Sequence, residues 1–233
     1  MAKDVIVALD FDSKEKALAF LDNFNEEIYV KVGMELFYKE GPEIIKEIKK
    51  RGHKIFLDLK LHDIPNTVES ATKSLMNLDV DMINYHIAGG EEMLSRSTKA
   101  AKELNENIIT LGITMLTSTS EEMMHEDILI KDNLNIEDTV LSYAKTGKKS
   151  NLSGVVCSAL EVPKIKSELG EEFLTVTPGI RLKSLNNDDQ KRVVTPIDAR
   201  KLGSDYIVVG RPITKSETPF ESYCEIKKMF LGE

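Results

Sequence analysis

The sequence predicts an α/β fold of the (β/α)₈ TIM-barrel class, and three observations lead to it. Short β-rich runs alternate with segments of helical periodicity, and this alternation repeats eight times along the chain. Several runs are almost entirely apolar, as expected of parallel strands that are covered on both faces. The chain has 233 residues, close to the roughly 250 residues of a typical barrel of this class. We therefore predict a single barrel domain over residues 1–233.

The predicted strands are short runs of apolar and β-branched residues. They cover residues 5–10, 29–33, 54–60, 82–87, 108–115, 153–158, 174–177 and 206–210. Between the fifth and sixth strands, the polar segment 117–150 is longer than one helix. We expect this segment to contain extra helical pieces and a mobile loop.

Helix-start signals precede the segments between strands. Asp12 and Glu15 have the spacing of a capping box, in which each side chain caps the backbone near the other. Pro65 stands where the first turn of a helix accepts proline. These signals predict helices that begin near residues 12 and 65.

Composition excludes several classes of function. The net charge of −8 and the pI of about 5.2 argue against nucleic acid as a partner, because binding a phosphate backbone requires a basic surface. No run approaches the roughly 20 apolar residues of a membrane span, and the N-terminus lacks the pattern of a signal peptide. The two cysteines have neither metal-ligand nor CxxC spacing. We expect a cytoplasmic protein with reduced thiols.

Charged residues gather where the predicted strands end. Asp10 ends the first strand, Lys31 lies in the second, and Asp58 and Lys60 end the third, with Asp63 in the loop that follows. Catalytic groups of a barrel lie at the carboxyl ends of its strands. Asp58 and Lys60 are two residues apart and so point to the same side of their strand. The pattern predicts an alternating Lys–Asp–Lys–Asp array in one small volume.

An alternative interpretation is a buried salt-bridge network that only fixes the geometry of the barrel. Burial costs several kcal/mol per ion, and replacing a buried ion pair by apolar residues is often neutral or stabilising. Valine or leucine could therefore fill a purely structural role. A functional cluster with strongly coupled pKa values is the better interpretation.

A metal site is a second alternative. His62 lies between Asp58 and Asp63, and these three residues are possible ligands. Lys60 stands between the two acids and would repel a divalent cation. We therefore expect no metal here, and we expect His86 to pack beneath the site.

The stretch FLDLKLHDIPNTV, which contains Asp58-x-Lys60-x-x-Asp63, resembles the characteristic motif of the orotidine 5′-phosphate decarboxylase family. The other matching pieces are VALDF with Asp10, VKVGMELF with Lys31, LTS with Thr117, TPGIR with Arg181, and VVGRPIT with Gly210 and Arg211. They run from the first strand to the last. The resemblance implies decarboxylation of orotidine 5′-phosphate to uridine 5′-phosphate (UMP), the last step of de novo UMP synthesis, without cofactor or metal.

The resemblance also implies a catalytic set. Lys60 would stabilise the carbanion left by the departing CO₂ and then protonate it. Asp58 would lie close to the substrate carboxylate and hold Lys60 charged and oriented, with Lys31 and Asp63 completing the array. In the family the second Asp of the motif acts in the neighbouring subunit's site. Asp63 and Thr67 are therefore expected to act across the interface of a homodimer.

A set of substrate-binding residues is implied in the same way. They are Asp10, Lys31, Thr67, Thr117, Arg181, Gln190, Gly210 and Arg211. Asp10 would accept a hydrogen bond from a ribose hydroxyl or the base, Lys31 would also reach a ribose hydroxyl, and Thr117 would contact the pyrimidine. The Arg211 guanidinium can pair bidentately with phosphate, beside the backbone N–H groups of residues 210 and 211 at a helix start.

The segment 181–191 is polar and lacks an apolar stripe. We expect it to be a mobile loop that closes on the ligand, since loops of this kind commonly gate active sites. An ordinary surface loop is the alternative.

Two competing functions share part of this pattern. A 3-keto-L-gulonate 6-phosphate decarboxylase would use Mg²⁺ and an enediolate, but in that subgroup an acid stands where this chain has Lys31. A non-catalytic nucleotide-phosphate binder would not need Lys60 beside Asp58. Insensitivity of turnover to EDTA would exclude the first, and turnover itself would exclude the second.

Overall fold

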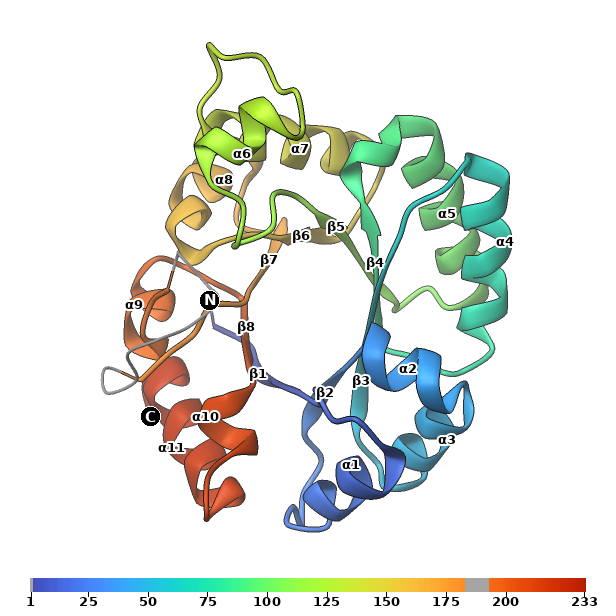
Figure 1. The fold of residues 1–233 in the computed structure, drawn as a ribbon, viewed down its shortest axis with the longest axis vertical. Helices are drawn as coiled ribbons and strands as arrows, with labels where there is room; N and C mark the ends of the chain where they lie inside the picture. Colours follow the sequence, from blue (N-terminus) through green and yellow to red (C-terminus); the bar gives the residue numbers. More distant parts are fainter. Residues whose placement is uncertain (1, 183–192) are drawn as a thin grey trace.

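The strands of the protein form a closed parallel barrel, which confirms the predicted fold class. In the computed structural model, which describes residues 2–182 and 193–233, eight strands pair in chain order and the eighth pairs with the first (Figure 1). They are β1 (Asp4–Ala8), β2 (Tyr29–Gly33), β3 (Lys54–Leu61), β4 (Met82–His86), β5 (Ile109–Ile113), β6 (Gly154–Val156), β7 (Leu174–Thr177) and β8 (Tyr206–Val209). The predicted strands 29–33 and 174–177 are confirmed to the residue, whereas the predicted strand 153–158 shortens to β6.

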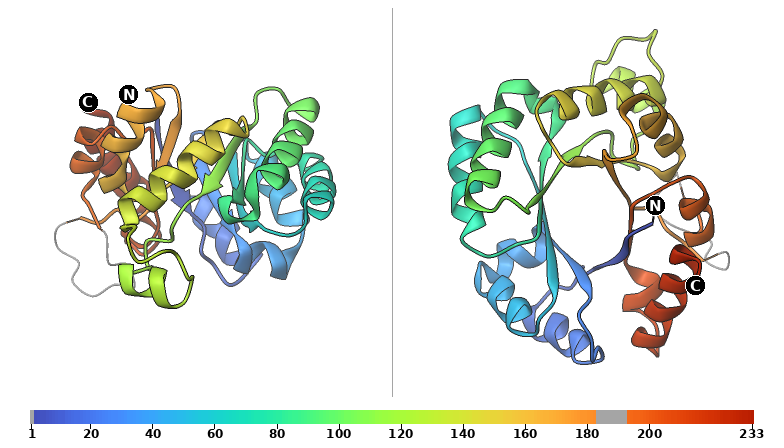
Figure 2. Two further views of the ribbon diagram at one scale, coloured as in Figure 1. Left: turned by 90° about the horizontal axis from the view of Figure 1, so that it is seen from above. Right: turned by 180° about the vertical axis from the view of Figure 1, so that it is seen from behind.

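Helices fill the connections and surround the ring of strands. They are α1 (Lys14–Leu21), α2 (Met34–Glu40), α3 (Glu43–Lys50), α4 (Pro65–Met76), α5 (Gly90–Leu104), α6 (Glu121–Glu126), α7 (Ile136–Lys149), α8 (Val162–Leu169), α9 (Pro196–Lys201), α10 (Arg211–Thr214) and α11 (Pro219–Leu231). Figure 2 shows α4 and α5 packed side by side on the outer surface. The extra helical pieces predicted in segment 117–150 are confirmed as α6 and α7.

The core has two layers because side chains alternate along each strand. One layer fills the inside of the barrel and contains Ile6, Tyr29, Phe56, Met82, Leu111, Val176 and Val208. The other layer lies between the strands and the surrounding helices, where Ile55 and Leu57 of β3 belong to the same cluster as Ile44 and Ile48 of α3. Along a strand, the residue two positions after an inner-layer residue therefore also points into the barrel.

The predicted capping box at the first helix is wrong. Helix α1 begins at Lys14, and its N-cap is Ser13, whose hydroxyl accepts a hydrogen bond from the Lys16 backbone N–H at 3.4 Å. Because Ser13 supplies the cap, the Asp12 carboxylate is left to pair with the Lys16 ammonium at 2.8 Å. The prediction for Pro65 is confirmed, since α4 begins at this residue.

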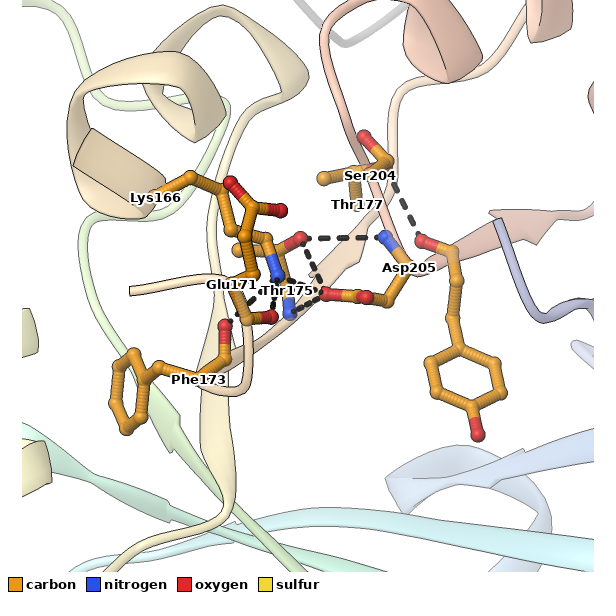
Figure 3. Close-up of polar contacts among 8 residues, drawn as sticks. Lys166, Glu171, Phe173, Thr175, Thr177, Ser204 and Asp205 are labelled. Atoms are coloured by element: carbon orange, nitrogen blue, oxygen red, sulfur yellow. Dashed lines mark hydrogen bonds and ion pairs between the residues drawn. The ribbon is translucent and has the colours of Figure 1, made fainter. Parts of the chain in front are cut away.

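A buried ion pair joins α8 to the amino-terminal ends of β7 and β8 (Figure 3). Lys166 is 6% exposed and Asp205 is 1% exposed, and their side chains meet at 2.7 Å. The Lys166 ammonium also donates to the backbone oxygens of Glu171 and Phe173, so all three of its protons have acceptors. The same Asp205 oxygen accepts from the backbone N–H and the hydroxyl of Thr175. Since this end of a barrel serves stability rather than chemistry, we interpret the cluster as structural.

Replacing Lys166 by methionine should lower the free energy of unfolding by about 3–5 kcal/mol, because it leaves the Asp205 carboxylate buried without its counter-ion. Lys164→Met on the same helix is the matched control. Lys164 pairs with Asp138 at a partly exposed position, so its loss should cost about 1 kcal/mol or less. Urea unfolding of both variants measures the difference. Equal losses would show that the buried pair contributes no more than the exposed one.

Candidate active site

Charged side chains continue the inner layer of the barrel toward the carboxyl ends of the strands. On β3, Phe56 belongs to the inner layer, and Asp58 and Lys60 follow it at alternate positions. On β2, Lys31 follows the inner-layer residue Tyr29 in the same way. Residues 31 and 56 are register partners, and residues 33 and 58 are the partners after them. Strand alternation and parallel register therefore bring Lys31, Asp58 and Lys60 into one volume.

A cavity of about 630 Å³ opens at this end of the barrel, a size typical of small-molecule sites. Apolar side chains line part of it, including Phe56, Val156 and Val208. Asp10 after β1 and the charged residues of β2 and β3 line another part, and the cationic side chains of Arg181, Arg211 and Lys215 line the cavity as well. Cationic and apolar side chains in one cavity suit an anionic ligand that also has a less polar portion.

The Asp58 carboxylate is the centre of an ion-pair chain. One of its oxygens lies 2.7 Å from the Lys60 ammonium, and the other lies 3.3 Å from the Lys31 ammonium. Lys31 also contacts Asp10 at 3.1 Å. The side chains of Lys31 and Asp58 are only 13% and 11% exposed, whereas Asp10 is 63% exposed. The strong part of the chain is therefore the buried pair of Lys31 and Asp58, with Lys60 beside it.

Neighbouring charges keep this chain ionised despite its burial. Burial alone would raise the pKa of Asp58, but the charges of Lys31 and Lys60, with their hydrogen bonds, outweigh it and the pKa is lowered. Burial alone would lower the pKa of Lys31, but Asp58 and Asp10 outweigh it and the pKa is raised. The pair of Lys31 and Asp58 is therefore charged at neutral pH, and these fixed charges can act on charge that develops in a ligand.

We expect the coupling free energy between Lys31 and Asp58 to be constant from about pH 5 to about pH 9 and to fall in acid. The folded pKa of Asp58 lies below its ordinary value of 3.8, so its stabilisation is present above that pH and is lost as pH falls through the folded pKa. The folded pKa of Lys31 lies above 10.5, so its stabilisation is present below that pH and is lost as pH rises through the folded pKa. A double-mutant cycle of Lys31→Met and Asp58→Leu, unfolded by urea at each pH, measures the coupling. A coupling that changed steeply near pH 7 would contradict this assignment.

The backbone at Lys60 departs from the strand. Its φ of +52° lies in the left-handed region, which costs a non-glycine residue about 1–3 kcal/mol. Leu57 pairs with Ile83 on β4, and the next pair joins Leu61 to Tyr85. Three residues of β3 therefore face one residue of β4, which is a bulge. Bulges and strained residues of this kind concentrate beside active sites, where they aim a side chain.

The cavity also collects most of the other residues expected to bind substrate. Thr117 lies in the turn after β5 and is half-buried in the lining. Gly210 is the N-cap of α10 and Arg211 is its first residue, and both line the cavity. Arg181 follows β7 and lines it too, with its guanidinium donating to the Ile180 carbonyl at 2.8 Å. Gln190 and the rest of the predicted mobile loop from 183 onward lie outside the described residues.

Asp63 and Thr67 are not brought to the array within one chain. Asp63 is exposed, and its carboxylate accepts a hydrogen bond from the Ile64 backbone N–H at 2.6 Å. Among residues 2–182 and 193–233 it forms no ion pair. Thr67 is exposed in the first turn of α4, and the Ile64 side chain between them is 66% exposed. The predicted fourth member of the array is therefore not among the residues that line its own chain's cavity.

One residue at the centre of the site was missed by the sequence analysis. Asn84 of β4 is fully buried, and its amide bonds both Asp58 and the backbone of Lys60. A signal existed, because Asn84 is a polar residue in a buried strand with the same alternation as Met82.

The histidines near the site pack against each other. The rings of His62 and His86 lie 5.4 Å apart. Burial, followed by the neighbouring His62 and the positive Lys60, lowers the pKa of His86, so that its ring is neutral at pH 7. In the part of the chain that the structure describes, no cluster of three His, Cys, Asp or Glu side chains is arranged to hold a metal ion. The same part contains no helix that is long and apolar enough to cross a membrane.

Comparison with known proteins gives consistent matches over nearly the whole chain. A family model described as orotidine 5′-phosphate decarboxylase / HUMPS family matches residues 3–226. A relative from Staphylococcus saprophyticus, named orotidine 5′-phosphate decarboxylase, is 54% identical over 227 residues, which cover 97% of this chain and 98% of the relative. A relative of the same name from Bacillus cytotoxicus is 56% identical over 237 residues, covering 100% of this chain and 99% of its own.

Solved structures give the same result for the fold. The crystal structure of orotidine 5′-phosphate decarboxylase from Lactobacillus acidophilus superimposes with a TM-score of 0.88 at 40% identity, covering 98% of this chain and 99% of that chain. An uncharacterised conserved protein from Geobacillus kaustophilus superimposes with a TM-score of 0.86 at 42% identity, covering 97% of this chain and 99% of its own.

Proposed function

Because the chain belongs to the orotidine 5′-phosphate decarboxylase / HUMPS family, we propose that it decarboxylates orotidine 5′-phosphate to UMP and CO₂. This reaction would be the last step of de novo pyrimidine nucleotide synthesis. The observation that carries the proposal is the buried chain of Lys31, Asp58 and Lys60 in a cavity also lined by Arg181 and Arg211. The proposal includes a cytoplasmic setting, as for the nucleotide-metabolising enzymes that the relatives are named as.

Lys60 is proposed as the residue that acts on the reacting carbon. When the bond between C6 of the pyrimidine and its carboxylate breaks, the electron pair stays on C6 and CO₂ leaves. An ammonium fixed beside C6 stabilises this developing carbanion and then transfers a proton to it. The 2.7 Å contact with Asp58 supports this role, because it limits the movement of the ammonium.

Asp58 and Lys31 are proposed to maintain the electrostatic pattern around Lys60. Asp58 would lie near the substrate carboxylate, whose negative charge is lost as CO₂ departs. Interactions that favour the transition state over bound substrate raise the rate, and an anion placed there has this effect. Lys31 balances the Asp58 charge when the cavity is empty and would also reach a ribose hydroxyl. Asp10, at the outer end of the same chain, would accept a hydrogen bond from the ribose or the base.

The phosphate is proposed to bind at the other end of the cavity. The Arg211 guanidinium and the backbone N–H groups at the start of α10 supply donors suited to a phosphate dianion. Arg181 would add a second cation, and Gln190 a further contact. Thr117, after β5, would contact the pyrimidine between the two ends. Tight binding of a phosphate remote from C6 is one way to supply energy that lowers the barrier at C6.

The active unit is proposed to be a homodimer in which Asp63 and Thr67 complete the partner's site. The exposure of both residues, with the exposed Ile64 between them, supports action on another chain rather than on their own. A two-fold dimer uses the same surface of each subunit, so each would both give and receive an Asp63. The proposal requires neither a metal nor an organic cofactor.

The test is the loss of orotidine 5′-phosphate absorbance with purified protein, with and without EDTA. We expect rapid loss that EDTA does not change, with UMP as the product. Loss only in the presence of Mg²⁺ would identify a metal-dependent relative instead. UMP binding without any turnover would identify a nucleotide-binding protein.

A further inference from the structure

Asn84 occupies the position on β4 that faces the bulge in β3. The bulge leaves Lys60 without a regular ladder partner, because residues 58, 59 and 60 all face this one residue of β4. The Asn84 side-chain oxygen accepts a hydrogen bond from the Lys60 backbone N–H at 2.8 Å. A side chain therefore replaces the backbone partner at the point where Lys60 adopts its left-handed conformation.

The other half of the same amide contacts the centre of the ion-pair chain. The Asn84 side-chain nitrogen donates to Asp58 at 2.6 Å, and the acceptor is the oxygen that also binds the Lys60 ammonium. The orientation of the amide is fixed by its neighbours, since a backbone N–H can only donate and a carboxylate can only accept. An aspartate at this position would face Asp58 with a second acceptor, and a leucine would satisfy neither neighbour.

From these contacts we infer that Asn84 is a positioning residue for Lys60, holding both its backbone and its carboxylate partner in the arrangement that the reaction requires. The inference rests on the proposed decarboxylase function. Asn84 is fully buried, with 0% exposure, so it acts through Lys60 and Asp58 rather than by touching the ligand. One amide therefore positions Lys60 at two points. The Asn84 oxygen holds the Lys60 backbone N–H, and the Asn84 nitrogen holds the Asp58 carboxylate that accepts from the Lys60 ammonium.

The expected consequence is a loss of kcat with little change in ligand binding. Asn84→Leu keeps a similar volume and removes both hydrogen bonds, and Asn84→Asp keeps the acceptor for Lys60 but loses the donor to Asp58. We expect each to lower kcat by about 100-fold, the loss that a displacement of about 1 Å in a catalytic group can cause. The Kd for UMP, measured by calorimetry, should stay within about threefold of wild type, because phosphate and ribose contacts are unaffected. If Asn84→Leu does not fold, kcat and the Kd for UMP of Asn84→Asp still test the inference.

The pH profile separates positioning from a merely structural role. The donor from Asn84 is one of the groups that hold the pKa of Asp58 low, after its two lysine neighbours. Lys31, Lys60 and Asp10 are the charged groups of this chain, and the titratable rings of His86 on β4 and of the adjacent His62 lie beyond it. Without the Asn84 donor the pKa of Asp58 rises, so the acid limb of the kcat profile should move to higher pH in Asn84→Leu. The limb is compared only over the pH range in which circular dichroism shows both proteins folded, and there a loss of stability alone would not move it.

Thr175→Val is the matched control. Thr175 is also a fully buried polar residue of the barrel that donates to a buried aspartate, Asp205, but it lies at the amino-terminal end. We expect it to lower the melting temperature and to leave kcat per folded molecule unchanged. If Asn84→Leu and Asn84→Asp behaved like Thr175→Val, with kcat and pH profile of wild type, the positioning role would be overturned while the function stood. Absence of turnover in the wild-type protein would overturn the proposed function, and the positioning role with it.

Discussion

Lys60→Ala should abolish measurable decarboxylation while leaving UMP binding intact. The substitution removes both the cation beside the developing carbanion and the proton donor. Electrostatic stabilisation and general acid catalysis each contribute about 10²-fold or more, so we expect kcat to fall by at least about 10⁴-fold. The phosphate-binding end of the cavity involves Arg181 and Arg211 rather than Lys60, so UMP should still bind. Single-turnover decay of orotidine 5′-phosphate and calorimetric titration with UMP measure the two quantities.

Lys54→Ala is the matched control for this variant. Lys54 begins the same strand, β3, and pairs with Glu27 on the surface at 3.0 Å. Its removal also deletes one lysine from β3, but it does so at the opposite end of the barrel from the cavity. We expect wild-type kcat for Lys54→Ala. Near-normal turnover by Lys60→Ala would remove Lys60 from the mechanism, and equal losses in both variants would point to damage of the strand as a whole.

The inner face of the barrel could be read from the sequence because its cause is local. Alternation along a strand is fixed by the geometry of an extended chain, so placing Phe56 inside the barrel also places Asp58 inside. The register of parallel neighbours then brings Lys31 beside them. The positions of the strands in the sequence were therefore enough to predict that Lys31, Asp58 and Lys60 lie close together.

The bulge at Lys60 could not be predicted in the same way. Simple alternation already puts Lys60 on the same side of the strand as Asp58, so the predicted proximity of the two residues was right. The left-handed backbone at Lys60 and its hydrogen bond with Asn84 were not part of that prediction. Whether a strand slips against its neighbour depends on hydrogen bonds between segments distant in sequence. The same limit applies to the buried pair of Lys166 and Asp205, which are 39 residues apart and which no sequence pattern brings together. The misassigned cap of α1 has a local cause, since Ser13 and Asp12 compete for one helix start.

Asp63 shows a third limit, because the structure of one chain does not test its predicted role. The motif puts Asp63 only three residues after Lys60, yet its carboxylate accepts from the Ile64 N–H at the N-cap of α4 and Asp63 does not line the cavity. Proximity in sequence therefore does not lead to proximity in the same cavity. The assignment of Asp63 to a partner's site stays a prediction, and it has consequences that a single-site variant cannot reveal.

Mixed dimers of Lys60→Ala and Asp63→Asn subunits should regain about half the turnover of a wild-type dimer. Each variant alone should be nearly inactive. Loss of Lys60 costs at least about 10⁴-fold in kcat, and loss of Asp63 removes one charged group of a preorganised site, at a cost on the order of 10²–10³-fold. In the mixed dimer, the site built on the Asp63→Asn subunit has its own Lys60 and receives an intact Asp63 from the partner. The other site lacks both groups. Two affinity tags, used in sequence, isolate the mixed dimer before its turnover is measured.

The reciprocal dimer makes the result decisive. It joins a wild-type subunit to one that carries both Lys60→Ala and Asp63→Asn. If Asp63 acts across the interface, each site of this dimer lacks one group and turnover stays low. If Asp63 acts within its own chain, the wild-type subunit keeps a complete site, and the reciprocal dimer is active while the first mixed dimer is not. The two hypotheses therefore predict activity in opposite dimers. Both dimers contain the same substitutions in equal amounts, so differences in folding or expression cannot imitate the result.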